Sequence, residues 1–201
     1  MGIEVSDAIP KKVVILASGE GSVAQSLFDS VSSAQGQLYG KIEIARVISE
    51  NPTAGILARA DQANLKKEVI PFRSGSERKL WESELSQAIS EVNPWLVVSA
   101  GFMKILSPEF VRRFRIINTH PSLLPAFPGA YAVRDALAAG VRESGCTLHY
   151  IDQGIDTGSI IAQRSLEVLP GESESSLHER IKVLERELIV TGILTLLEEV
   201  Q

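Results

Sequence analysis

The stretch VVILASGEGSVA, residues 13–24, decides the fold class of this 201-residue chain. Its first five residues are apolar and mostly β-branched, which favours a strand buried on both faces. Ser18 and Gly19 end that strand, and the residues from Ser22 to about Ser33 predict a helix. A strand that passes through a glycine-containing turn into a helix is typical of the first part of an α/β fold.

The same alternation continues through the first half of the chain. Further strands are predicted at 42–48, 68–72 and 95–100, with helices at 53–64 and ending at 92. Such alternation predicts a mostly parallel twisted sheet with helices on both faces. Ligands of these sheets bind beyond the carboxyl ends of the strands, so a site is expected around 18–22, 101–107 and 118–128.

The second half has a different pattern. A proline-punctuated loop is followed by a helix at 131–139, strands at 146–151 and 159–168, and a long helix from about 173 to 200. We detect no repeat and no linker. The chain is therefore expected to form one domain, 1–201, with a Rossmann-like N-terminal half at about 12–100 and a second half at about 101–200.

Composition excludes several classes of protein. The chain is 44% apolar and 22% charged with a net charge of −5, which indicates a folded protein and disfavours nucleic-acid binding. The single cysteine, Cys146, cannot form an intramolecular disulfide and fits a reducing cytoplasm. The apolar runs are too short for a membrane span, and the start lacks a secretory pattern, so a cytoplasmic protein away from membranes is expected.

The turn after the first strand fits the G-x-G-x-x-A pattern at Gly19, Gly21 and Ala24. Glycines let the backbone approach an anion, and the first amides of a helix point at it. The alternatives are a dinucleotide site, for which Glu50 is the nearest acidic residue, and a tight turn without a ligand. Glu20 adds negative charge within the turn, so its side chain is expected to point away from a bound anion.

Asn118 and His120 lie two residues apart at the end of a predicted strand, so their side chains share one face. An amide donor beside a group that exchanges protons suits stabilisation of an oxyanion with proton transfer. A capped turn is the alternative. Asp156, in a glycine-flanked turn, and Asp152 are either functional or turn formers. These groups fall short of a metal-ligand set, so no metal is expected.

The long C-terminal helix carries one apolar stripe, made of Leu177, Ile181, Leu184 and Leu188. Lys182 and Glu185, three residues apart on the same helix, predict by themselves only a surface ion pair.

Taken together, these segments resemble the phosphoribosylglycinamide formyltransferase family. The resemblance rests on Ser18-Gly19-x-Gly21-Ser22, SAGFMKILS at 99–107, NTHPSLLPAFPG at 118–129 and Asp156-Thr157-Gly158, and it covers roughly 12–197. It implies the formyltransferase fold, with a nucleotide-binding first half and a folate-binding, catalytic second half. It also implies direct transfer of the formyl group of 10-formyltetrahydrofolate to the amine of glycinamide ribonucleotide in de novo purine synthesis.

The resemblance assigns roles to individual residues. Asn118 and His120 match the groups that stabilise the oxyanion, and Asp156 matches a carboxylate that orients a water and tunes the histidine. The substrate phosphate and ribose would be bound by Gly21, Ser22, Val23, Lys182 and Glu185. The folate would be bound by Met103, Lys104, Ile105, Leu106, Val111 and Asp152, with Gly101 and His149 in supporting positions.

The chain departs from the family in places, and other functions remain open. The family often has Asn where Glu20 and Val23 stand and Arg where Lys104 stands, and many members continue past the last helix. The nearest alternative functions are formyltetrahydrofolate deformylase and methionyl-tRNA formyltransferase, whose extra domains we do not find. A nicotinamide-dependent oxidoreductase and a non-catalytic folate- or nucleotide-binding module are the alternatives of another class. The oligomeric state is left open, with a homodimer as one alternative.

Overall fold

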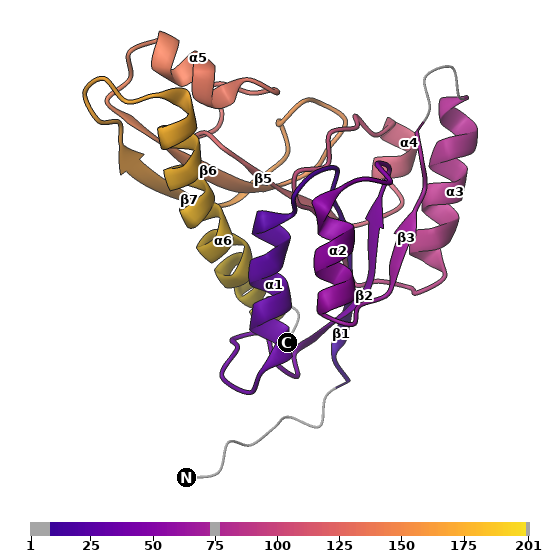
Figure 1. The fold of residues 1–201 in the computed structure, drawn as a ribbon. Coiled ribbons are helices and arrows are strands. Elements are labelled where there is room, and N and C mark those ends of the chain that lie inside the picture. Colours follow the sequence, from indigo (N-terminus) through magenta and orange to yellow (C-terminus); the bar gives the residue numbers. More distant parts are fainter. Residues whose placement is uncertain (1–8, 73–76, 200–201) are drawn as a thin grey trace. The chain divides into compact units, whose positions relative to one another are not determined.

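The structure is a computed structural model that describes residues 9–72 and 77–199. The chain divides into two compact units, the first ending at Ile105 and the second beginning at Leu106 (Figure 1). The boundary lies a few residues beyond the halves expected from the sequence. That the two units fold as one domain stays a prediction.

The first unit alternates strands and helices as its sequence predicts. Its elements are β1 (Lys11–Leu16), α1 (Ser22–Ser32), β2 (Ile42–Ser49), α2 (Gly55–Gln62), β3 (Lys67–Val69), α3 (Arg78–Ser90) and β4 (Leu96–Ser99). The strand order is β3-β2-β1-β4, and the three neighbouring pairs are parallel. The continuous apolar runs of β1 and β4 follow from burial on both faces, since residues 13–16 are fully buried and Leu96, Val97 and Val98 nearly so.

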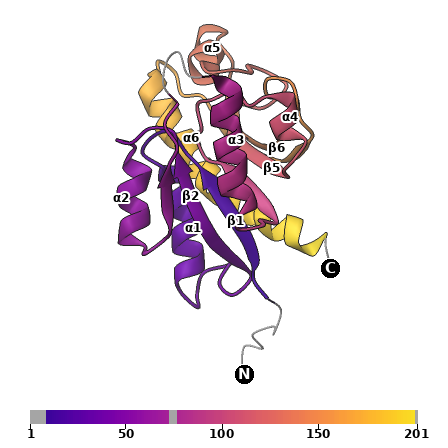
Figure 2. The same cartoon turned by 90° about the vertical axis from the view of Figure 1, so that its right-hand side faces the viewer.

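Helices cover both faces of this parallel sheet. α1 and α2 pack against each other and against β2 on one face, while α3 lies on the other face (Figures 1 and 2). Right-handed crossovers produce this arrangement, because the chain moves outward from β1 to β3 and then returns to β4. The carboxyl ends of β1 and β4 therefore bring the turn at 17–22 and the segment at 100–105 to the same edge.

The second unit is antiparallel. Its elements are α4 (Pro108–Val111), β5 (Ile116–His120), α5 (Ala132–Ala138), β6 (Glu143–Tyr150), β7 (Ile160–Glu167) and α6 (Glu174–Glu198). β6 pairs with β5 on one side and with β7 on the other. α6 packs on β6 and β7, with Leu177, Ile181 and Leu188 fully buried and Leu184 at the margin of the stripe.

The expected fold class is confirmed. The first unit is a parallel α/β sheet of the Rossmann type, and the second adds antiparallel strands covered by a long helix. None of the helices within the described ranges is long and apolar enough to span a membrane.

Candidate functional site

The turn between β1 and α1 presents main-chain groups rather than side chains. Gly21 is the N-cap of α1, has φ 69° and offers no side chain to cap the helix. A β-carbon on Gly21 would lie 2.4 Å from Cδ1 of Ile56, so a larger residue would collide with α2. The first amides of α1, including those of Ser22 and Val23, are not capped by the N-cap residue. This local structure suits an anion, as the sequence predicts.

A hydroxyl of the same turn holds the segment that follows β4. Ser18 Oγ accepts a hydrogen bond from the Met103 N–H at 2.7 Å, and the Ser18 N–H donates to the Gly101 carbonyl at 3.1 Å. Gly101 has φ 73°, which turns the chain out of the strand. The side chains of Met103 and Ile105 are 73% and 70% exposed. The segment therefore presents two apolar side chains at the surface beside this turn.

Lys104 lies between a carboxylate and an aromatic ring. Its Nζ is 3.8 Å from Oε1 of the buried Glu50 and 5.4 Å from the centroid of Phe72. Glu50 stands at the end of β2, where a dinucleotide site would need an acidic residue. Its carboxylate instead faces the Lys104 ammonium.

The predicted catalytic side chains come together at the end of β5. Asn118 and His120 share one face of the strand, and Asp156 joins them from the loop between β6 and β7. Asp156 Oδ2 lies 3.4 Å from Nδ1 of His120 and accepts a hydrogen bond from the Gly129 N–H at 2.8 Å. The three residues, called the catalytic cluster below, lie close enough for a hydrogen-bond network with proton transfer.

Both ring nitrogens of His120 face acceptors. Nε2 lies 2.8 Å from the Phe127 carbonyl, and Nδ1 faces Asp156. Each of these oxygens can accept a hydrogen bond from an imidazole N–H. The His120 side chain is 6% exposed and that of Asp156 15%, which strengthens their electrostatic interaction.

The buried His149 is held as a neutral ring. It stands opposite Asn118 in the β5–β6 register. Nδ1 lies 2.9 Å from the Tyr150 carbonyl and must donate to it, which leaves Nε2 to accept from the Asn118 amide at 3.3 Å. Asp156 Oδ1 is 3.6 Å from the same Nε2. Burial lowers the pKa of His149 below its usual range, in agreement with the neutral ring.

Lys182 and Glu185 do not form the ion pair that their spacing predicts. The Lys182 ammonium lies 2.8 Å from the Glu179 carboxylate, whereas Glu185 is buried and hydrogen-bonded to the Thr119 side chain. Burial raises the pKa of Glu185 to about 7, against the opposing effects of Thr119 and Lys182. A buried carboxylate beside the strand of the catalytic cluster is a stronger candidate for a functional group than a surface partner would be.

The remaining predicted folate residues differ in their environments. Met103–Ile105 belong to the first unit, whereas Leu106 and Val111 are buried residues of the second. Asp152 is exposed, and its Oδ1 accepts hydrogen bonds from the Gly154 N–H and the Thr157 hydroxyl. Asp152 therefore shapes the loop that ends in Asp156.

Sequence reasoning missed two main-chain contacts of the catalytic cluster. They are the Phe127 carbonyl, which faces His120, and the Gly129 N–H, which donates to Asp156. Both belong to the proline-rich loop after β5, where Phe127 and Gly129 have φ 53° and 90°. The signal available was the Pro-Gly pair at 128–129, which marks a turn but does not say what its amide contacts.

No cluster of three or more His, Cys, Asp or Glu side chains that could hold a metal occurs within residues 9–72 and 77–199.

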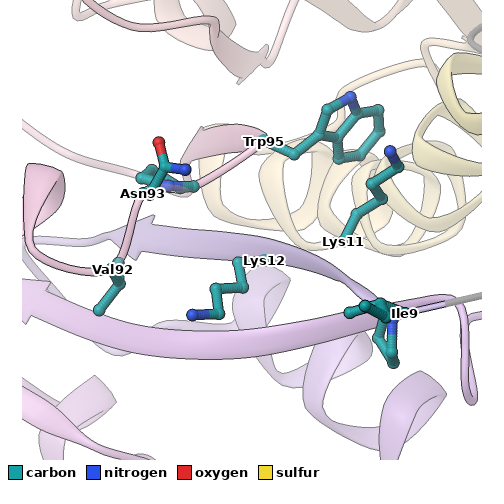
Figure 3. A pocket seen from close by; sticks show the side chains of 8 residues that line it. Ile9, Lys11, Lys12, Val92, Asn93 and Trp95 are labelled. Atoms are coloured by element: carbon teal, nitrogen blue, oxygen red, sulfur yellow. The ribbon is translucent and has the colours of Figure 1, made fainter.

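A cavity of about 400 Å³ opens at the amino-terminal ends of β1 and β4, where the Lys11 side chain extends toward Trp95 (Figure 3). None of the described residues that line it is predicted for the site. The turn at 18–22, called the phosphate turn below, and the 100–105 segment lie at the carboxyl ends of β1 and β4, which are the opposite ends of these strands.

Comparison with known proteins gives independent information. A model of the formyl transferase family matches residues 11–193. The chain is 43% identical to phosphoribosylglycinamide formyltransferase of Mycobacterium tuberculosis, over 96% of this chain and 88% of that protein. It is 42% identical to the trifunctional purine biosynthetic protein adenosine-3 of Drosophila pseudoobscura pseudoobscura, over 95% of this chain but 14% of that protein.

Solved structures show the same fold. Glycinamide ribonucleotide transformylase 1 of Symbiobacterium toebii has a TM-score of 0.90 at 32% identity, covering 96% of this chain and 90% of that one. Phosphoribosylglycinamide formyltransferase of Brucella melitensis has a TM-score of 0.86 at 32% identity, covering 94% of this chain and 96% of that one. These likenesses extend over nearly the whole chain.

Proposed function

The chain belongs to the formyl transferase family, and from this premise we propose that Asn118, His120 and Asp156 carry its reaction. The chain is an enzyme that transfers a formyl group in purine biosynthesis, with 10-formyltetrahydrofolate as co-substrate and glycinamide ribonucleotide as acceptor. The observation that carries the residue assignment is the position of the Asp156 carboxylate, 3.4 Å from His120 at the end of the strand that also holds Asn118.

The chemistry is a direct attack. The amine nitrogen of the ribonucleotide bonds to the formyl carbon, and the carbonyl electrons move to oxygen to give a tetrahedral oxyanion. The donors proposed for that oxygen are the Asn118 amide and the His120 Nε2–H, whose hydrogen the oxyanion would share with the Phe127 carbonyl. Collapse of the intermediate breaks the bond to the folate N10. The proton lost by the attacking nitrogen reaches N10 through a water oriented by Asp156.

The supporting role proposed for His149 follows from its tautomer. Since its Nε2 accepts from Asn118 Nδ2, the amide is held with its nitrogen toward β6 and cannot flip without losing that hydrogen bond. A second N–H on the same nitrogen is then available to the oxyanion. The Asp156 carboxylate lies between the two imidazoles, 3.4 Å from His120 Nδ1 and 3.6 Å from His149 Nε2.

Substrate binding is proposed to use main-chain and side-chain groups. The amides of Gly21, Ser22 and Val23 would hold the phosphate. This proposal is supported by the start of α1, where the N-cap residue has no side chain to cap these amides. Lys182 and Glu185 are proposed as contacts of the phosphate and ribose. For the folate, the proposed contacts are Met103, Lys104, Ile105, Leu106, Val111 and Asp152, with Gly101 in support. We also expect the reaction to take place in the cytoplasm. A homodimer is the assembly that we propose to test by light scattering.

A spectrophotometric assay tests this proposal. Tetrahydrofolate should be released from 10-formyltetrahydrofolate only when glycinamide ribonucleotide is present, and the ribonucleotide should gain the mass of one formyl group. Release at the same rate without the ribonucleotide would make water the acceptor, as in a deformylase. No release under either condition would overturn the catalytic assignment in favour of a binding module.

A further inference from the structure

Helix α2 holds the two carbonyl groups at the centre of the phosphate turn. The Ile56 N–H donates to the Gly19 carbonyl at 3.1 Å. The Arg59 Nε donates to the Glu20 carbonyl at 2.7 Å. Arg59 also reaches the first helix, where its Nη1 lies 3.2 Å from Oε1 of Gln25. One arginine thus ties α2 to both the turn and α1.

These two hydrogen bonds fix the direction of the peptide groups. In a trans peptide the carbonyl and the following N–H point in opposite directions. Within the described residues, the cis peptide is Leu124-Pro125, so the peptides around Glu20 are trans. With the Gly19 and Glu20 carbonyls directed at α2, the N–H groups of Glu20 and Gly21 point away from it. The Gly21 N–H is one of the donors proposed for the phosphate.

The acidic side chain of the turn lies against the start of α2. A β-carbon built on Gly55 would be 2.5 Å from Oε2 and 3.0 Å from Oε1 of Glu20, so the carboxylate occupies the space that the glycine leaves. Ala54, the N-cap of α2, provides no side-chain cap. A carboxylate is favoured there because a helix start carries partial positive charge. The negative charge of Glu20 is thereby compensated outside the phosphate turn.

We propose that α2 sets the phosphate turn for anion binding, with Arg59 and Gly55 as positioning residues. Arg59 orients the Glu20–Gly21 peptide so that its N–H is presented to the anion. Gly55 leaves room for the Glu20 carboxylate at the start of α2. The inference rests on the proposed function, because it takes the Gly21–Val23 amides as the phosphate site. It explains how this chain binds a phosphate with Glu20 in the turn.

The first test removes the guanidinium. Arg59→Ala should weaken ribonucleotide binding about tenfold, the size expected for one hydrogen bond from a charged group. The dissociation constant is measured by calorimetry without folate, and the KM for each substrate by the transfer assay. kcat and the KM for the folate should stay within about twofold, which a general structural defect would not spare. Lys66→Ala, which removes an exposed cation just after α2, is the matched control and should bind like the wild type.

The second test displaces the carboxylate without touching the turn. Gly55→Ala places a methyl group against Glu20, and alanine in a helix should not lower the melting temperature. Ribonucleotide binding should weaken severalfold, and the double variant Gly55→Ala with Glu20→Ala should recover it. Wild-type affinity in both Arg59→Ala and Gly55→Ala, with the wild type active, would overturn the inference alone. Absence of ribonucleotide-dependent transfer in the wild type would overturn the proposed function and the inference with it.

Discussion

The phosphate turn of the first unit and the catalytic cluster of the second use different parts of the chain. The turn at 18–22 presents backbone amides at the start of α1, and the carboxylate of Glu20 lies against Gly55 of α2. The catalytic cluster depends on an amide, an imidazole and a carboxylate. His120 and Asp156 lie 3.4 Å apart, and Asn118 and Asp156 lie 3.3 and 3.6 Å from Nε2 of His149. A site built from main-chain donors tolerates side-chain change, whereas a site built from side chains does not.

The largest effect is expected where the catalytic cluster loses its charge. Asp156→Asn keeps the size of the side chain and can still accept from Gly129, but it lacks the carboxylate that we propose orients a water for proton transfer beside His120. Turnover should fall by about 10³-fold, as when an electrostatic or proton-transfer group is removed. The folate dissociation constant, measured by fluorescence titration, should change by less than about twofold.

Asp135→Asn, at a half-buried aspartate of α5 that pairs with Arg134 on the surface, is the matched control for that variant. It should turn over at the wild-type rate. An Asp156→Asn enzyme with near wild-type turnover would remove Asp156 from the mechanism and leave it as a turn former.

A smaller effect is expected at Lys182, which we propose to serve binding rather than chemistry. Lys182→Ala should raise the KM for the ribonucleotide about tenfold, the effect of losing one charge-assisted hydrogen bond, with a smaller change in kcat. Steady-state kinetics at constant ionic strength measure both. Glu179→Gln removes its present partner and should leave the KM unchanged or lower it. An unchanged KM in Lys182→Ala would return this lysine to the role of a surface cation.

Lys182 also illustrates why spacing alone misassigned its partner. Glu179 and Glu185 both lie three residues from Lys182, so sequence cannot choose between them. The choice follows from burial, since Glu185 stands next to the apolar stripe of α6 and turns inward to Thr119. The lysine remains part-exposed and pairs with the outer carboxylate.

The elements of the fold were predictable where the patterns are long, and less so where they are short. The strand predicted at 68–72 ends at Val69, because Pro71 has no N–H to donate to the sheet. The short helix α4 was not predicted, although Ser107 caps it by accepting from the Phe110 N–H and Pro108 begins it. For the candidate site, Asn118, His120 and Asp156 could be proposed from sequence because their side chains carry the signal, and the structure brings His120 and Asp156 to within 3.4 Å. The Phe127 and Gly129 contacts use backbone groups, which every residue has.

Acid should destabilise the catalytic cluster through His149. Its pKa is lowered in the folded state, so the unfolded chain binds more protons and this stability is lost as the pH falls below about 6.5. The free energy of unfolding of the wild type, measured by urea denaturation from pH 8 to pH 5, should therefore fall. The titration of this group should contribute up to about 1.4 kcal/mol per pH unit to that fall. His149→Gln, which cannot titrate, should show a shallower decline, whatever its stability at pH 8. Parallel pH profiles for the two proteins would contradict a neutral His149.

The smallest effect is expected in the phosphate turn, and it tests the comparison from the other side. Ser22→Ala keeps the backbone N–H that the proposed phosphate contact uses and removes only the hydroxyl, so the KM for the ribonucleotide should change less than about threefold. Ser22→Pro is the informative partner, because proline has a φ suited to the start of a helix but no N–H to donate. If the amide is the donor, the proline variant should lose about tenfold in ribonucleotide affinity. Its melting temperature is measured alongside, because a proline disfavours the ψ of 29° that Gly21 adopts before it. Equal effects of the two substitutions would mean that the hydroxyl, and not the backbone, binds the phosphate, and the two regions would then differ less than we infer.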